Sequence, residues 1–164
     1  MSWQDQIHNW DPKDFGGIRK LTVSPHDIWV PDIFLYSSIS RRNIEKDTLD
    51  INILLGYDGI CQWIPPIIYQ SSCETNMRDF PFDVQNCSLK FGSWVHSSEF
   101  IDIRIAENTP VDLSEYLENA EFTMLETFGV RKLSNYSCCS DTYIDIFFYL
   151  VLRRKSEFYV QVYF

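Results

Sequence analysis

The sequence lacks any long apolar run. Its longest one extends from Ile146 to Leu152, well short of the roughly 18 residues or more that a membrane-spanning helix needs. The opening stretch, "MSWQDQIHNWD", is polar and has no apolar centre of the kind found in a secretory signal peptide. We therefore expect the 164 residues to form a soluble domain or the ectodomain of a membrane protein.

Positive charge is also scarce. The chain has 14 Lys and Arg against 23 Asp and Glu, which gives a net charge of −9. This balance argues against a nucleic-acid partner, because phosphate binding requires a basic surface. An acidic surface is compatible with a cationic ligand, but it also serves solubility, and charge alone favours the latter interpretation.

Groups that carry catalysis are missing as well. The three histidines, His8, His26 and His96, have no nearby Ser or Cys in a nucleophile arrangement. The "DFGG" at 14–17 lacks the other signatures of a kinase. No C-x-x-C or Cys/His grouping indicates zinc. We expect no enzymatic activity, no cofactor and no metal site.

Five cysteines occur, at positions 61, 73, 87, 138 and 139. Two N-x-S glycosylation sequons begin at Asn86 and Asn135. Either sequon alone is a weak signal, but together with the cysteines they favour an oxidising, extracellular compartment. Cys61 is expected to be unpaired and to act as a small buried hydrophobe.

Alternating apolar residues predict short strands, and the class is all-β with a sandwich arrangement. The Asp58-Gly59 pair predicts a tight hairpin turn, since glycine readily adopts the left-handed conformation. Helix evidence is limited to 114–125, where the apolar spacing does not persist. The predicted strand regions are 49–64, which contains the hairpin, then 87–94, 100–107 and 143–155.

Several aromatic residues stand near strand ends, beside Ser, Gly or Cys. If their ring faces converge, they make a cage for a quaternary ammonium, with about 0.5–2 kcal/mol from each face. Taken singly, each ring is more often part of a core, and spacing does not show convergence. The residues are Tyr36, Trp94, Tyr136 and Tyr143.

The segment between Cys73 and Cys87 has an apolar centre, Phe80-Pro81-Phe82-Asp83. A turn with this much exposed apolar bulk favours docking onto another surface. The alternative is that both phenylalanines fold beneath the loop. A disulfide closing the loop would stabilise the fold by roughly 3 kcal/mol.

This cysteine-bounded segment resembles the signature loop of the pentameric Cys-loop receptors. "WVPDIFLY" (29–36), "FGSW" (91–94) and "YSCCSDTY" (136–143) resemble binding loops A, B and C of nicotinic acetylcholine receptor alpha-type subunits. "WDPKDFGGI", "CQWIPP" and "RRKSEFYVQV" are also similar to that family. The resemblance implies an immunoglobulin-like β-sandwich, with residues 1–164 forming one ligand-binding domain. On this resemblance, the family's N-terminal helix, first strand and membrane domain would lie outside residues 1–164.

The resemblance also implies roles for individual residues. Loops A, B and C would supply the principal face of an agonist site, and Trp29 and Asp32 would support loop A. The implied disulfides are Cys73–Cys87 and the vicinal pair Cys138–Cys139 at the tip of loop C. The implied ligand-binding residues are Tyr36, Trp94, Tyr136, Cys138, Cys139 and Tyr143.

Two further residue sets follow from the resemblance. Lys90 and Asp145 would form a charge pair that links loop C to the sandwich through Tyr136. The full coupling set is Lys90, Asp145, Phe82, Asp83 and Arg154. The complementary face, offered to a neighbouring subunit, would contain Leu54, Gln62, Ile64 and Asp112.

The implied function is agonist binding by the extracellular domain of a nicotinic acetylcholine-gated channel subunit. The ligand would be acetylcholine or a related quaternary ammonium, bound between subunits of a homo- or hetero-pentamer. The location would be the outer face of the plasma membrane, at a synapse or another cell surface, with the membrane domain outside this sequence. The alternatives are a secreted acetylcholine-binding protein without a pore and a cell-surface adhesion sandwich.

Overall fold

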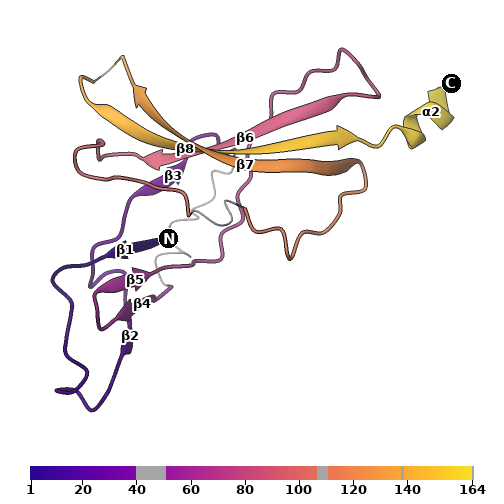
Figure 1. Ribbon diagram of the computed structural model, residues 1–164. Coiled ribbons are helices and arrows are strands. Elements are labelled where there is room, and N and C mark those ends of the chain that lie inside the picture. Colours follow the sequence, from indigo (N-terminus) through magenta and orange to yellow (C-terminus); the bar gives the residue numbers. More distant parts are fainter. Residues whose placement is uncertain (40–50, 107–110, 138, 164) are drawn as a thin grey trace. The chain divides into compact units, whose positions relative to one another are not determined.

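The computed structural model describes residues 1–39, 51–106, 111–137 and 139–163. They form two four-stranded sheets (Figure 1). All the strand pairs are antiparallel. In these ranges the one α-helix is α2, Glu157–Tyr163. The all-β class predicted from the sequence is confirmed, and two antiparallel sheets are what the expected β-sandwich contains.

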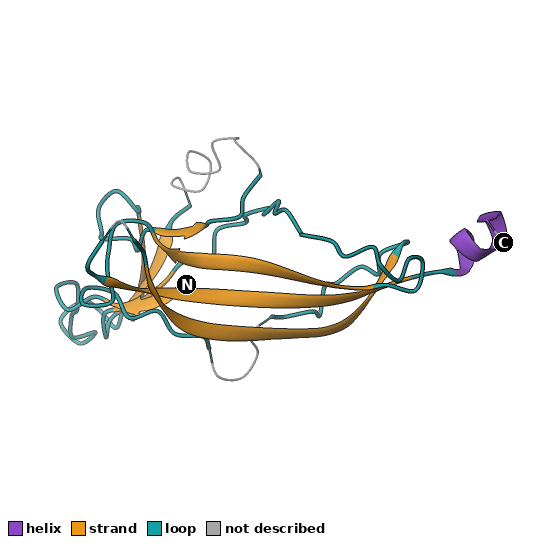
Figure 2. Cartoon of the chain, turned by 90° about the horizontal axis from the view of Figure 1, so that it is seen from above, coloured by secondary structure: helices purple, strands orange, loops and turns teal. Residues whose placement is uncertain are grey.

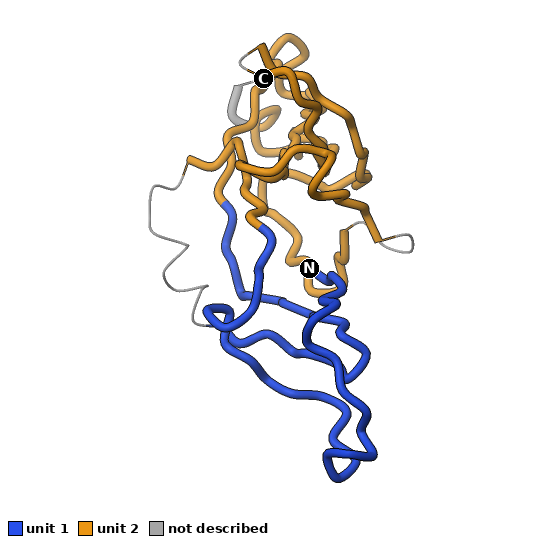
Figure 3. The backbone as a smooth tube through the Cα atoms, turned by 90° about the vertical axis from the view of Figure 1, so that its left-hand side faces the viewer, with its two compact units in different colours: residues 1–31, 41–69 blue, residues 32–40, 70–164 orange. Residues whose placement is uncertain are grey.

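The chain divides into two compact units, residues 1–31 with 41–69 and residues 32–40 with 70–164 (Figure 3). The first unit holds the sheet ordered β1-β5-β4-β2, whose strands are β1 Ser2–Gln4, β2 Lys20–Val23, β4 Ile53–Gly56 and β5 Ile60–Gln62. The second holds the sheet ordered β3-β6-β8-β7, whose strands are β3 Ile33–Leu35, β6 Val84–Ser93, β7 Phe122–Asn135 and β8 Thr142–Arg154.

The core of the first unit lies on one face of its sheet. Ile53 and Leu55 of β4 are buried, while Leu54 between them is exposed, as the alternation predicts. Cys61 is fully buried in the same cluster and unpaired, which confirms the expectation for this residue. Burial raises the pKa of its thiol, and Trp63 completes this side of the core.

The predicted hairpin joins β4 to β5. The Gly59 amide donates to the Gly56 carbonyl at 2.9 Å, and Gly59 has a φ of 81°. This conformation favours glycine over residues with a Cβ. A Cβ here would also collide with the backbone carbonyl oxygen of Asp5, so the turn is constrained by both conformation and space.

In the second unit the long strands β6, β8 and β7 lie side by side (Figure 2). The pairing of β6 with β8 runs from Val84 opposite Arg153 to Gly92 opposite Asp145. Strand β7 was not predicted, because its apolar residues do not alternate regularly. A register shift between Met124 and Glu126 interrupts its pairing with β8.

One local prediction from the sequence is wrong. Residues 101–106 form no strand, although their burial alternates as expected: instead of a ladder partner, the Arg131 side chain donates to the Ile103 carbonyl at 2.9 Å. In 114–125, where the helix evidence is limited, the structure has a turn from Leu113 to Tyr116, and β7 begins at Phe122.

The turn glycine provides a test of this description. Gly59→Ala should lower the free energy of unfolding by about 2 kcal/mol or more, because left-handed strain adds to the collision with Asp5. Gly16→Ala is the matched control: φ is 64° there and nothing lies within 4 Å of the added Cβ, so only about 1 kcal/mol should be lost. Urea unfolding measures both, and equal losses would show that the approach to Asp5 does not matter.

Candidate functional site

Asp32, just before β3, binds the turn that follows β6. Its Oδ1 accepts from the Ser93 hydroxyl at 2.7 Å, and its Oδ2 accepts from the amides of Trp94 and Val95 at 3.0 and 2.8 Å. His96 Nδ1 lies 2.9 Å from Oδ1. Partial burial alone would raise the pKa of Asp32, but the hydrogen bonds from Ser93, Val95 and His96 outweigh it and lower this pKa. The carboxylate therefore holds the backbone that presents Trp94.

The four aromatic residues singled out in the sequence form two contacting pairs. The rings of Tyr36 and Trp94 are 5.7 Å apart between centroids, and those of Tyr136 and Tyr143 are 5.5 Å apart. The Tyr36 hydroxyl donates to the Ser93 carbonyl at 2.8 Å. The Trp94 side of the first pair remains open, since Trp94 is 67% exposed.

Lys90 of β6 joins the two ring pairs. Its Nζ lies 4.7 Å from the ring centroid of Tyr36 and 4.9 Å from that of Tyr136. Both distances are within the range of a cation–π contact. The structure therefore places one ring of each pair beside an ammonium group supplied by the chain itself.

The same lysine makes an ion pair with Asp145 of β8. The Lys90 Nζ is 3.0 Å from Oδ2 and donates to the Tyr136 hydroxyl at 2.6 Å, and this hydroxyl donates to Oδ2 at 2.7 Å. Partial burial would lower the pKa of Lys90, but the bonds to Tyr136 and Asp145 raise it. Asp145 is fully buried, and its other oxygen, Oδ1, has no hydrogen-bond partner in the described part of the chain.

Gly92 leaves the space that this cluster needs. A Cβ at this position would lie 2.8 Å from Asp145 Oδ1 and 3.0 Å from Tyr36 Cε2. A larger residue would therefore push apart the buried carboxylate and the first ring pair. The single glycine carries no sequence signal, because its neighbours come from β8 and from the residue after β3.

Loop C spans residues 136–143 at the turn between β7 and β8. Cys138 lies outside the described residues, while Cys139 takes part in a disulfide and its amide donates to the Tyr136 carbonyl at 3.2 Å. The vicinal pairing stays a prediction. Asn135 is exposed at the end of β7, and its Oδ1 accepts from the Thr142 hydroxyl at 2.9 Å.

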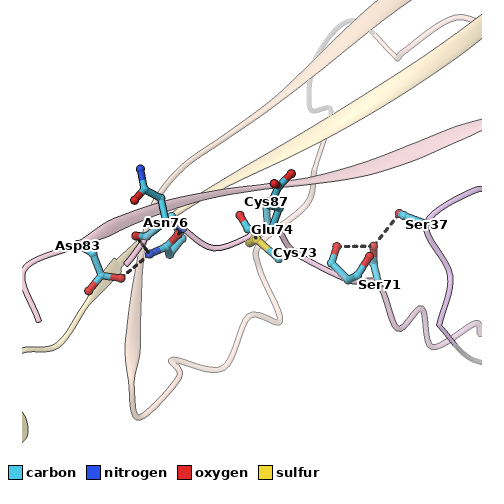
Figure 4. Close-up of a disulfide and its surroundings, with 9 residues drawn as sticks. Ser37, Ser71, Cys73, Glu74, Asn76, Asp83 and Cys87 are labelled. Atoms are coloured by element: carbon cyan, nitrogen blue, oxygen red, sulfur yellow. Dashed lines mark hydrogen bonds between the residues drawn. A yellow bond between two sulfur atoms is a disulfide. The ribbon is translucent and has the colours of Figure 1, made fainter. Parts of the chain in front are cut away.

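A disulfide joins Cys73 to Cys87, with a Cα–Cα distance of 5.1 Å (Figure 4). Asn76 of this loop and Gln85 of β6 exchange two hydrogen bonds of 2.9 Å. An open cavity of about 630 Å³ adjoins the disulfide rather than the aromatic rings. It is lined by residues 72–77, Asn86 and Ser88, so the sequon asparagine Asn86 faces a polar hollow.

At the same end of β6, Asp83 and Arg154 form a buried pair. The guanidinium donates through Nε to Oδ1 at 2.7 Å and through a terminal nitrogen to Oδ2 at 3.1 Å. The bond from Arg154 lowers the pKa of Asp83. The guanidinium also lies over the Phe80 ring at 5.2 Å, whereas Phe82 projects outward and is 67% exposed. One of the two loop phenylalanines therefore packs, and the other does not.

Strands β6 and β8 connect these two clusters. Asp83 precedes β6 and Trp94 follows it, while Asp145 and Arg154 lie near opposite ends of β8. Ten residues of β6 separate the ends by roughly 30 Å, at about 3.3 Å per residue. Figure 1 shows the two ends of this strand pair far apart, so the aromatic cluster and the disulfide loop occupy its opposite ends.

The residues predicted for the complementary face divide between the units. Leu54 of β4 and Gln62 of β5 are cross-strand partners, and both are exposed. Ile64, two residues beyond Gln62, is 83% exposed. The three belong to the first unit, whereas Asp112 belongs to the second, where its carboxylate accepts from the Ser114 amide at 2.9 Å.

Trp29, expected to support loop A, contacts Trp3 edge-on, with ring centroids 6.2 Å apart, and its role stays a prediction. Sequence reasoning missed the link from His96 to Asp32, because a lone histidine in a loop has no distinguishing pattern. No grouping of potential metal ligands occurs in the ranges that the structure covers. Nor is any helix there long and apolar enough to cross a membrane.

An all-β chain with this disulfide loop and aromatic cluster has the organisation of a receptor domain. Residues 1–156 match the neurotransmitter-gated ion-channel ligand binding domain, and the chain belongs to that family.

Its relatives include an "acetylcholine receptor subunit alpha-like" protein of Manduca sexta, 40% identical over 167 residues that cover 97% of this chain and 32% of the relative. They also include the neuronal acetylcholine receptor subunits alpha-6 and alpha-2 of Mus musculus, 40% and 38% identical, covering 96% and 97% of this chain and 31% and 30% of those relatives. The resemblance to nicotinic alpha-type subunits is confirmed. These relatives are channel subunits, not enzymes, and this chain spans about a third of their length.

The buried ion pair predicts an asymmetric mutational response. Lys90→Met should cost about 2–4 kcal/mol of unfolding free energy, because it leaves the buried Asp145 charge with only the Tyr136 hydroxyl. Asp145→Asn should cost about 1–2 kcal/mol, since the partly exposed ammonium can still reach water. The double variant should cost at least about 1 kcal/mol less than the sum. Urea unfolding measures the cycle, and additive losses would rule out the coupling.

The Asp83–Arg154 pair predicts that the stability of the fold depends on pH. Because the folded-state pKa of Asp83 is lowered, its stabilisation is present above the unfolded-state pKa of about 4 and is lost as pH falls below it. Between pH 7 and 3, the wild type should lose more stability than Asp83→Asn. Asp102→Asn is the control: two arginines also lower the pKa of this carboxyl group, but it is exposed and solvent screens the pairs, so its loss should flatten the slope much less. Equal slopes in wild type and Asp83→Asn would contradict the assignment.

Proposed function

We propose that this chain is the extracellular agonist-binding domain of a nicotinic acetylcholine-gated channel subunit. The agonist, acetylcholine or a related quaternary ammonium, binds among Tyr36, Trp94, Tyr136 and Tyr143. The observation that carries this proposal is the position of the Lys90 ammonium between the rings of Tyr36 and Tyr136.

The ring arrangement supports a cation as ligand. The electron-rich faces of Tyr36 and Tyr136 already attract one ammonium, and the Trp94 indole, the best cation–π partner among the side chains, remains open beside them. Asp145 keeps Lys90 in place through the ion pair, so an agonist adds to this cluster without replacing the lysine. Each additional ring face contributes about 0.5–2 kcal/mol.

The second half of the site comes from a neighbouring subunit. In this proposal residues 1–164 are one domain of a longer subunit that assembles as a homo- or hetero-pentamer at the outer face of the plasma membrane. The exposed Leu54, Gln62 and Ile64 form part of the complementary face. Leu54 and Gln62 lie on the β4–β5 pair, and Ile64 follows β5. The exposure of these neighbouring side chains supports an interface role.

Coupling to the pore uses the strand pair β6–β8. Loop C carries Tyr136, which bonds to Lys90 and Asp145, so closure of loop C over an agonist acts on this cluster directly. At the far end, Asp83 and Arg154 tie the disulfide loop to the end of β8, and Phe82 is free to contact the membrane domain. Gating requires the agonist to bind the closed form of loop C better than the open form.

The cage is tested by comparing charged and neutral ligands on the full-length subunit in membranes. Trp94→Ala should weaken acetylcholine binding about 30-fold, the equivalent of a well-formed cation–π contact of ~2 kcal/mol. It should have a much smaller effect on 3,3-dimethylbutyl acetate, the neutral carbon analogue. Competition binding gives both affinities.

Phe15→Ala is the matched control, since Phe15 is also an exposed aromatic residue but belongs to the first unit; it should change either affinity less than about twofold. Equal losses for the two ligands in Trp94→Ala would rule out charge recognition by the cage. Failure of the wild type to bind any quaternary ammonium would favour the adhesion class.

A further inference from the structure

We propose that His96 is a positioning residue for the agonist: acting through Asp32, it orients Trp94 and makes agonist affinity depend on pH. The inference rests on the proposed function, because it concerns the same cage. It assigns a role to a histidine that lies outside the aromatic cluster.

His96 contacts the Asp32 cluster at two points. Its Nδ1 lies 2.9 Å from Asp32 Oδ1, and its backbone amide donates to the Ser93 hydroxyl at 2.8 Å. That hydroxyl has one proton, which it gives to the same Oδ1 at 2.7 Å. His96 and Ser93 therefore hold one carboxylate oxygen together, while the other oxygen receives the amides that position Trp94.

Removing the imidazole would leave Oδ1 with the Ser93 hydroxyl alone. The carboxylate could then rotate about its terminal bond. The hydrogen bonds that Oδ2 accepts from the Trp94 and Val95 amides would lengthen or lose alignment. Hydrogen bonds weaken steeply as alignment is lost. The orientation of the Trp94 ring over the cage would become less well defined, and that loss of preorganisation reduces affinity.

The proton on His96 also changes the charge beside the cage. Because a carboxylate only accepts, Nδ1 carries a hydrogen in either state, and protonation adds the second hydrogen at Nε2. Asp32 is the charged group that faces the imidazole; the hydroxyl of Ser93 and the amides of Trp94 and Val95 are uncharged. An imidazole ordinarily changes charge between pH 5 and 8.

The Asp32 carboxylate lies beside the cage, because its Oδ2 accepts from the Trp94 amide at 3.0 Å. Burial raises the pKa of Tyr36, and the carboxylates of Asp145 and Asp32 add to that effect, with Lys90 opposing it. A negative Asp32 beside a neutral His96 therefore favours a bound cation. Protonated His96 cancels this charge, so affinity for a cation should fall as pH falls, although the hydrogen bond itself survives.

The test uses acetylcholine, whose quaternary ammonium does not titrate, on the full-length subunit in membranes. In the wild type, affinity should fall about threefold from pH 8 to 5.5, as expected for one partly screened charge. His96→Leu removes the donor and should weaken binding at pH 8 about tenfold, the equivalent of one charge-assisted hydrogen bond.

His96→Asn is the rescue variant, because its amide nitrogen takes the place of Nδ1 but does not titrate. It should bind within about twofold of wild type at pH 8 and show no decline at pH 5.5. His26→Asn, at an exposed histidine of the first unit, is the control and should keep the full pH dependence. Surface expression of each variant reports whether it folds.

The outcomes separate this proposal from the proposed function. Three results would each overturn the role of His96 while leaving the cage intact. They are an unchanged affinity in His96→Leu, a pH dependence that persists in His96→Asn, and a folded His96→Asn that binds as weakly as His96→Leu. Loss of acetylcholine binding in the wild type at every pH would overturn the proposed function and this inference with it.

Discussion

The register between β6 and β8 is the constraint on which both functional clusters depend. Opposite partners in an antiparallel pair project to the same face, and a slip of one residue moves every side chain of a strand to the other face. With Gly92 opposite Asp145, Lys90 lies diagonally beside that carboxylate on one face. At the other end, Val84 opposite Arg153 leaves Asp83 within reach of the Arg154 guanidinium.

Each end of this strand pair carries a charge pair that links the two strands. Lys90 of β6 meets Asp145 of β8, and Asp83, just before β6, meets Arg154 of β8. Burying charges has a large desolvation cost, so such pairs contribute little net stability. A shifted register would leave them buried and unpaired, which is far more costly. The two pairs therefore specify the alignment that places the aromatic cluster and the disulfide loop at fixed ends.

Parts of the fold with strong local signals were predictable. Alternation identified β4, β6 and β8, and Asp58-Gly59 identified the hairpin turn, because backbone period and turn conformation depend on neighbouring residues. The segment 101–106 shows the limit: its burial alternates, yet it has no strand pairing, since a ladder needs a partner that local sequence does not supply. β7 was missed for the opposite reason, because pairing with β8 stabilises a strand of irregular pattern.

The amino-acid sequence by itself determined the all-β class, the family, the cysteines that bound the disulfide loop and which aromatic residues to examine. The tertiary structure alone decided that the Lys90 ammonium lies between Tyr36 and Tyr136, and that Asp32 holds the turn of Trp94. Lys90 and Tyr136 are 46 positions apart in the sequence, and Asp32 and Trp94 are 62 positions apart. Such contacts depend on strand register and on the space left at Gly92, and neither of these can be read from local spacing.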